Sequence, residues 1–170
     1  AMEYYGVCDQ VYYDVYVSSE TSFKEFEFDG YTYCYVASKC KLGIENVHYS
    51  GGVRITDKER TTLDSIKDMD KISGIEEVLA NIDGFTSLNE EKLTGYLQEY
   101  HNQFLYQKTG FILYPYRDKL GLSHSFFEMC QSKTGKSKRY LTKEFTNGTY
   151  IKEWKLVVPD EIYKLKNGAF

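Results

Sequence analysis

Residues 53–66 read Val53-Arg-Ile-Thr-Asp-Lys-Glu-Arg-Thr-Thr-Leu-Asp-Ser-Ile66, and in this stretch the pattern changes from strand to helix. Its first residues alternate apolar and polar, as in a half-buried strand. Thr56 is followed three residues later by Glu59, which is the spacing of a capping box. In that motif the Thr56 hydroxyl accepts from the Glu59 amide, and the Glu59 carboxylate accepts from the Thr56 amide. We therefore predict a strand that ends before Thr56 and a helix from Thr56 to about Asp70.

The residues before this point have the composition of strands. Runs rich in β-branched and aromatic residues occupy residues 11–17, 23–28 and 31–36. Asp29-Gly30 separates the last two runs and has the sequence of a two-residue hairpin turn. A further strand is expected over residues 46–50, before Gly51-Gly52. The pattern predicts a mostly antiparallel sheet.

The middle of the chain has helical patterns. Ser73 with Glu76 and Ser87 with Glu90 repeat the capping-box spacing. Apolar residues at helical spacing predict the buried faces of two helices, namely Ile75, Val78, Leu79 and Ile82, and Leu93, Tyr96, Leu97, Tyr100 and Phe104. Two more helices are expected over residues 102–114, ending before Pro115, and over residues 123–131, with Phe126, Met129 and Cys130 pointing inward.

The end of the chain returns to a strand pattern. Residues 149–158 alternate, carry the only tryptophan, Trp154, and stop at Pro159. Strands, about four helices and strands again predict an α+β fold, in which a mainly antiparallel sheet from the N- and C-terminal strands accompanies a central group of helices. We expect a single domain over residues 1–170.

Composition narrows the class of protein. The chain has 170 residues and a formal charge of −4, which argues against a surface built entirely for nucleic acid. No segment approaches the roughly 20 apolar residues that span a bilayer, and no secretory signal is visible, so we expect a cytoplasmic protein without membrane contact. The four cysteines lack metal-site spacing, and we interpret them as reduced thiols.

One segment is strongly basic. Residues 131–143 contain five basic residues and no acidic one. The candidate contact residues in this segment are Lys133, Lys136, Lys138, Arg139, Tyr140 and Lys143. Lysine and arginine neutralise phosphates, and an aromatic ring can stack on a base. The segment is therefore either a solvated loop or a contact surface for nucleic acid or another anionic partner.

The sequence contains few patterns that are typical of enzymes. No nucleophile elbow, paired histidines or phosphate-binding loop is present, so no catalytic, cofactor-binding or metal-binding residue is predicted, and we expect a protein that is not an enzyme. The alternative is a small metal-dependent nuclease built on Glu59, Asp64 and Asp68 with a lysine. Arg60 lies four residues before Asp64, however, and an ion pair between them explains both residues more simply.

Six segments in order carry a resemblance to a known family. They are residues 4–17 (YYGVCDQVYYDVYV), 54–66 (RITDKERTTLDSI), 73–79 (SGIEEVL), 88–100 (LNEEKLTGYLQEY), 108–113 (KTGFIL) and 149–159 (TYIKEWKLVVP). Together they resemble the AbiEi-like antitoxins and transcriptional regulators of abortive-infection systems, over almost the whole chain. The family motif residues are Thr56, Glu59, Arg60, Asp64 and Gly110, for which we expect a structural role.

The resemblance implies a C-terminal, antitoxin-type domain. In this family that half is linked to neutralising a cognate toxin, a nucleotidyltransferase-like protein, while an N-terminal winged helix-turn-helix binds operator DNA and represses the operon. The residues before Val11 are too few for such a domain, so we expect a larger protein trimmed at its N-terminus. Lys108 stands where the family usually has arginine, and Thr62 replaces an aliphatic residue. No small-molecule substrate is implied.

Overall fold

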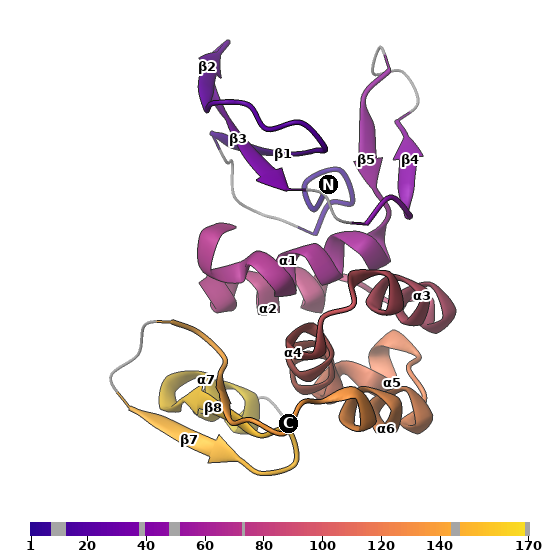
Figure 1. Ribbon diagram of the computed structural model, residues 1–170, viewed down its shortest axis with the longest axis vertical. Helices are drawn as coiled ribbons and strands as arrows, with labels where there is room; N and C mark the ends of the chain where they lie inside the picture. Colours follow the sequence, from indigo (N-terminus) through magenta and orange to yellow (C-terminus); the bar gives the residue numbers. More distant parts are fainter. Residues whose placement is uncertain (8–12, 38–39, 48–51, 73, 144–146, 169–170) are drawn as a thin grey trace.

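The computed structural model describes residues 1–7, 13–37, 40–47, 52–72, 74–143 and 147–168, and it places short strands on both sides of a helical centre (Figure 1). The elements in chain order are β1 (Asp14–Ser19), β2 (Phe26–Phe28), β3 (Tyr31–Ala37), β4 (Ile44–Asn46), β5 (Arg54–Thr56), α1 (Lys58–Ile72), α2 (Gly74–Gly84), α3 (Glu90–Tyr100), α4 (Gln103–Leu113), η1 (Tyr114–Tyr116), α5 (Arg117–Leu120), α6 (His124–Lys133), β6 (Arg139–Tyr140), β7 (Gly148–Ile151), β8 (Leu156–Pro159) and α7 (Asp160–Gly168). The predicted α+β class is confirmed.

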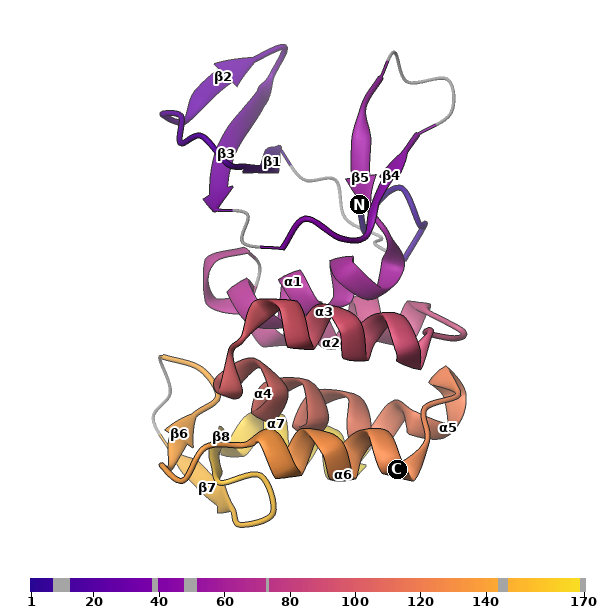
Figure 2. The same ribbon diagram turned by 45° about the vertical axis from the view of Figure 1, so that its right-hand side comes forward.

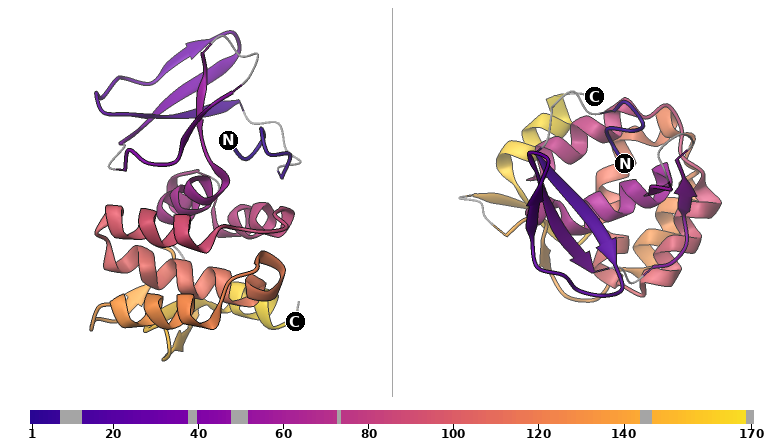
Figure 3. Two further views of the ribbon diagram at one scale, coloured as in Figure 1. Left: turned by 90° about the vertical axis from the view of Figure 1, so that its right-hand side faces the viewer. Right: turned by 90° about the horizontal axis from the view of Figure 1, so that it is seen from above.

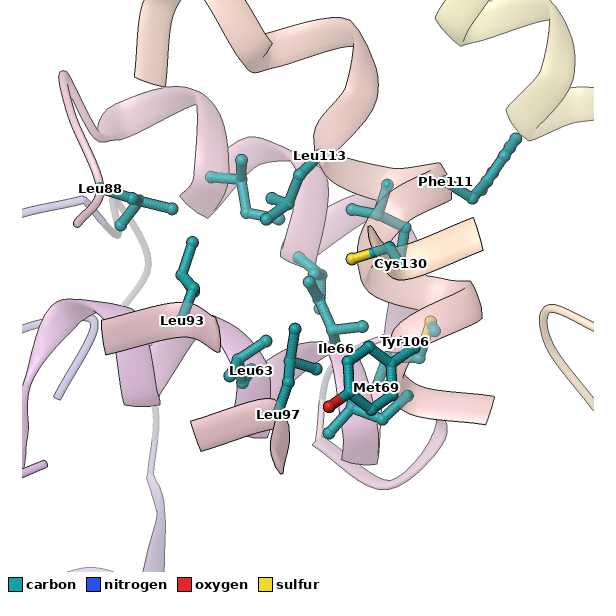
Figure 4. Close-up of a cluster of buried hydrophobic side chains, with 14 of the residues drawn as sticks. Leu63, Ile66, Met69, Leu88, Leu93, Leu97, Tyr106, Phe111, Leu113 and Cys130 are labelled. Carbon is teal, nitrogen blue, oxygen red and sulfur yellow. The ribbon is translucent and has the colours of Figure 1, made fainter. Parts of the chain in front are cut away.

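The hydrophobic core lies among the helices, where α1 contacts α2, α3 and α4, and α4 contacts α6. The predicted inward faces are largely confirmed. The buried members are Ile75, Val78, Leu79, Ile82, Leu93, Tyr96, Leu97, Tyr100, Phe126 and Cys130. Phe104 and Met129 are partly buried and pack against this cluster. Figure 4 shows part of the core, with Leu93, Leu97 and Cys130 among the labelled side chains. None of the helices in the described part of the chain is long and apolar enough to cross a membrane.

The strands form three separate small sheets instead of one. In the first, β3 lies between β1, which is parallel to it, and β2, which is antiparallel. The second is the antiparallel pair β4–β5, and in the third β8 lies between parallel β6 and antiparallel β7. Figure 2 shows the first two sheets at one end of the molecule and the third at the other. The helices occupy the space between them, so the N- and C-terminal strands do not pair.

The helix α1 is capped differently from the prediction. It begins at Lys58, and the carboxylate of Asp57 accepts a hydrogen bond of 2.8 Å from the amide of Arg60. Glu59 does not reach back to Thr56, because its carboxylate accepts from the amide of Asn89 at 2.7 Å. The capping box was therefore wrong: Asp57 is itself a strong N-cap residue, and a long-range contact takes up Glu59.

The cap predicted at Ser87 was also displaced. The Asn89 side chain accepts from the amide of Lys92 and caps α3. Glu90 instead accepts hydrogen bonds from the amide and the hydroxyl of Ser123, at 2.7 and 2.8 Å. The cap predicted at Ser73 lies outside the described residues. Both displaced glutamates join elements far apart in the sequence, and a capping-box spacing does not show this.

The last predicted strand is in fact a hairpin. Residues 152–155 form a turn between β7 and β8, with Lys155 at a φ of 50°. The alternation of residues 149–158 runs through this turn, so the pattern alone does not reveal it. Other predicted strands are shorter or shifted: β2 covers only the end of residues 23–28, and β4 ends where the run at 46–50 was expected to begin. Residues 11, 12 and 48–51 lie outside the described residues.

Candidate functional site

The motif residues Arg60 and Asp64 form the predicted ion pair. The Arg60 Nε atom lies 2.9 Å from the Asp64 carboxylate, and the Arg60 side chain is 2% exposed. Its Nη1 atom donates to the carbonyl oxygens of Cys40 and Leu42, both at 2.8 Å. The Tyr100 hydroxyl donates to the other carboxylate oxygen of Asp64. This network ties the segment before β4 to α1 and α3.

A second carboxylate, Asp57, has equally complete contacts. Its Oδ2 atom accepts from the Tyr96 hydroxyl at 2.6 Å and from the Lys92 ammonium at 2.9 Å. Burial, together with the adjacent carboxylates, raises the pKa of both Tyr96 and Tyr100 well above the ordinary value. Both phenols therefore remain hydrogen-bond donors to carboxylates over the whole neutral range.

The carboxylates of the alternative nuclease site do not converge. Glu59 bonds to the Asn89 amide, Asp64 to Arg60, and Asp68 to the ammonium groups of its own helix neighbours. Among the described residues, no three histidine, cysteine or acidic side chains are grouped so that they could hold a metal ion. The predicted cluster is therefore three separate structural contacts.

Gly110 and Thr56 also have structural positions. A Cβ atom on Gly110 would lie 2.1 Å from the Trp154 ring, so only glycine lets this ring rest against α4. The Thr56 and Thr61 hydroxyls are 2.7 Å apart, at the junction of β5 and α1. Cys130 lies next to Gly110, and burial raises the pKa of its thiol to about 12, which is typical of a core residue and not of a nucleophile. The motif residues therefore hold the fold together.

The predicted contact residues of the basic segment lie at the end of the molecule where the third sheet is found (Figure 2). Lys133 ends α6, and Arg139 and Tyr140 form β6. All six predicted side chains are exposed, namely Lys133, Lys136, Lys138, Arg139, Tyr140 and Lys143. The Lys138 ammonium lies 5.7 Å from the centre of the Tyr140 ring. The structure therefore gathers these residues on an accessible surface.

A buried lysine beside this segment was missed as a site residue. Lys108, on α4, is 5% exposed, and its Nζ atom lies 4.7 Å from the centre of the Phe104 ring. The Arg139 guanidinium lies 5.7 Å from the same ring. Burial lowers the pKa of Lys108 below its usual value. The i, i+4 spacing of Phe104 and Lys108 was visible in the sequence, but the approach of Arg139 was not.

The first sheet carries an aromatic face whose side chains are exposed or half-buried. The strand register puts Tyr13, Val15, Val17, Phe26, Phe28, Tyr31, Tyr33 and Tyr35 on one side of β1, β3 and β2, and we call this set the aromatic face. The Phe26 and Tyr33 rings are stacked with their centres 4.9 Å apart. Tyr13 is 68% exposed and Phe28 is 67% exposed. No residue of these three strands is buried.

The aromatic face points away from the helices. Tyr16, which lies on the opposite side of β1, donates from its hydroxyl to the carbonyl oxygen of Lys71 at the end of α1. Figure 3 shows the sheet above the helical layers. Residues 13–37 contain five acidic residues and one basic residue, so this end of the molecule is acidic. Strand alternation tells which side chains share a side of the sheet, but it does not tell whether that side is exposed.

Comparisons with known proteins give no relative. No family model matches the chain, and neither the curated proteins nor the solved structures gave a significant match. The resemblance to the AbiEi-like regulators thus stays a prediction from the sequence.

Proposed function

We propose that this chain is a non-catalytic interaction domain that binds a partner protein through its aromatic face. The observation that carries the proposal is a three-stranded sheet with eight apolar or aromatic side chains on one side. None of the eight is buried, and four are exposed, namely Tyr13, Phe26, Phe28 and Tyr31. Monomeric proteins rarely expose a contiguous patch of this kind unless it binds something. Tyrosine and phenylalanine are also enriched in protein interfaces.

The charge around the aromatic face favours a protein over nucleic acid. Stacked rings on a sheet are also found in proteins that bind single strands, but those surfaces are basic. Here Asp14, Glu20, Glu25, Glu27 and Asp29 outnumber the single base Lys24. Phosphates would be repelled, whereas a protein with an apolar centre and a basic rim would be attracted.

The resemblance to AbiEi-like antitoxins suggests the identity of the partner protein. In this proposal the partner is a nucleotidyltransferase-like toxin in the cytoplasm, and the domain neutralises it by binding. The basic segment, at the opposite end of the molecule, contacts nucleic acid and assists repression of the operon. Operator recognition itself belongs to the winged helix-turn-helix that such regulators carry.

Co-expression with the product of the adjacent gene tests the proposal. We expect a tagged domain to retain a nucleotidyltransferase-like partner through purification. The double variant Tyr13→Ser, Phe28→Ser should lose the partner while keeping its melting temperature, because both side chains are already exposed. Tyr150→Ser, which alters an exposed tyrosine on β7, is the matched control and should retain the partner. Absence of retention, or equal retention by the double variant, contradicts the proposal.

A further inference from the structure

Two exposed tyrosines lie on the same side of the third sheet. Tyr140 on β6 and Tyr150 on β7 are both in register with Val157 on the central strand β8. Residues in register on neighbouring strands point to the same side of a sheet, and neighbouring strands lie about 4.8 Å apart. The backbones of the two tyrosines are therefore roughly 10 Å apart. Tyr140 is 52% exposed and Tyr150 is 48% exposed, so both side chains are accessible to a ligand.

The side of the sheet that carries these tyrosines points away from the helical core. Ile151 on β7 is half-buried and packs against the core, whereas its neighbour Tyr150 is exposed. Leu156 and Val158, which flank Val157 on β8, belong to the core cluster. Because successive side chains of a strand point to opposite sides, the core lies on one side of the sheet and the tyrosines on the other. The tyrosines thus lie on the outer side.

The surroundings of the two tyrosines are positively charged. Residues 133–155 contain seven basic residues and two acidic ones. The Lys138 ammonium lies 5.7 Å from the centre of the Tyr140 ring, and Lys152 is exposed in the turn that follows β7. Proteins that bind single-stranded nucleic acids combine such features, because bases stack on aromatic rings while basic side chains attract the phosphates. The acidic surroundings of the aromatic face are the opposite of these.

We propose that the outer side of the third sheet binds a single-stranded nucleic acid by stacking its bases on Tyr140 and Tyr150. Lys138, beside the Tyr140 ring, contacts a phosphate of the same strand. A duplex suits this surface less well, because its bases are already stacked on one another. An acidic peptide would match the charge but not the pair of rings. The inference rests on the proposed contact between the basic segment and nucleic acid, and it specifies the ligand of that contact.

Fluorescence anisotropy with a labelled oligothymidylate of about 12 nucleotides tests the proposal on the natural chain alone. We expect this single strand to bind at least about fivefold more tightly than an abasic strand of the same length, since each stacked base contributes at least that factor. The abasic strand carries the same phosphates without bases. Equal affinity for the two strands would overturn the proposal, because the phosphates would then account for all the binding.

Substitutions assign the binding to the two rings. Tyr140→Ser and Tyr150→Ser should each weaken binding at least about fivefold without changing the slope of log affinity against log salt, because neither removes a charge. Tyr140→Phe keeps the ring and should bind as the natural chain does. Lys138→Met should instead reduce the salt slope by about 0.7, the value for one phosphate of a single strand. Unchanged binding by both serine variants would contradict the site.

Tyr4→Ser is the matched control. Tyr4 is 55% exposed, and its neighbour Tyr5 donates to the carbonyl oxygen of Thr56 on β5, at the opposite end of the molecule from the third sheet (Figure 2). This variant should bind the single strand as the natural chain does, and equal weakening by Tyr4→Ser and Tyr140→Ser would contradict the site. If a serine variant melts well below the natural chain, the comparison with the abasic strand still decides the question.

A DNA duplex of equal length distinguishes this inference from the proposed function. We expect the natural chain to bind the duplex more weakly than the single strand. If it binds the duplex equally well or better, the inference is wrong and the proposed contact with nucleic acid stands. If it binds neither, the inference and that part of the proposed function are both wrong.

Discussion

At Gly110 the missing side chain decides how α4 and the β7–β8 turn pack. Gly110→Ala would place a methyl group 2.1 Å from Trp154 and 3.1 Å from Cys130, so the ring must move out of the core. We expect a loss of about 2–4 kcal/mol in the free energy of unfolding, measured by urea denaturation. Gly95→Ala is the matched control within α3, where a Cβ atom meets nothing within 4 Å. It should stabilise the chain by about 0.5–1 kcal/mol. Equal effects of the two substitutions contradict this account of Gly110.

Arg60 is the residue on which the motif network depends. Arg60→Met leaves Asp64 and two backbone carbonyls without their donor, and breaking a buried pair in this way costs about 3–5 kcal/mol. The pair Lys41–Glu20 has the same 2.9 Å separation, but its side chains are 76% and 70% exposed. Lys41→Met should therefore leave the urea midpoint unchanged. A small effect of Arg60→Met would show that the network is dispensable.

At the scale of elements, the helices and their caps show which features local sequence patterns can predict. The inward faces of α2 and α3 followed from apolar spacing, because burial of one helix side imposes that period. The capping boxes failed because Glu59 and Glu90 bond to residues 30 and 33 positions away. The turn at residues 152–155 was missed because strand alternation continues through it. Local patterns therefore predicted the helices well, and their connections poorly.

The cap of α3 gives a direct test at this scale. Asn89→Ala removes the acceptor for the Lys92 amide and should cost about 0.5–2 kcal/mol of stability. Ser87→Ala alters the residue that the sequence favoured as the cap, and its hydroxyl only accepts from the exposed Lys58 side chain. Its effect should stay within about 0.5 kcal/mol. Urea denaturation of both variants measures these losses of stability. A larger loss for Ser87→Ala than for Asn89→Ala would contradict the cap at Asn89 and support the predicted capping box.

At the scale of the whole molecule, buried phenols couple stability to alkaline pH. Burial beside carboxylates raises the pKa values of Tyr5, Tyr96 and Tyr100 above the ordinary 10.0. The folded chain then holds more protons than the unfolded chain above that pH. The contribution of these three phenols to the free energy of unfolding is fully present below about pH 10 and is lost as the pH rises further. The free energy of unfolding should fall as the pH rises above about 10, and less steeply in Tyr100→Phe. An equal slope in both proteins would contradict the assigned environment of Tyr100.

The two ends of the molecule were only partly visible in the sequence. The basic segment was found because its charges are consecutive in the chain, and all six predicted side chains are exposed. The surroundings of Lys108 were missed because Arg139, which lies close to the same Phe104 ring, is 31 positions away in the chain. The aromatic face was missed as a site because alternation tells which residues share a side of a sheet, and packing of the whole chain decides whether that side is covered.

The central claim is that the aromatic face is the contact surface for a partner protein. Amide hydrogen exchange of the domain, alone and with the nucleotidyltransferase-like product of the adjacent gene, tests it most directly. The account predicts that the partner slows exchange in β2 and β3, and leaves the exchange of residues 133–143 unchanged. Unchanged exchange throughout the first sheet, or slowing confined to residues 133–143, would contradict it.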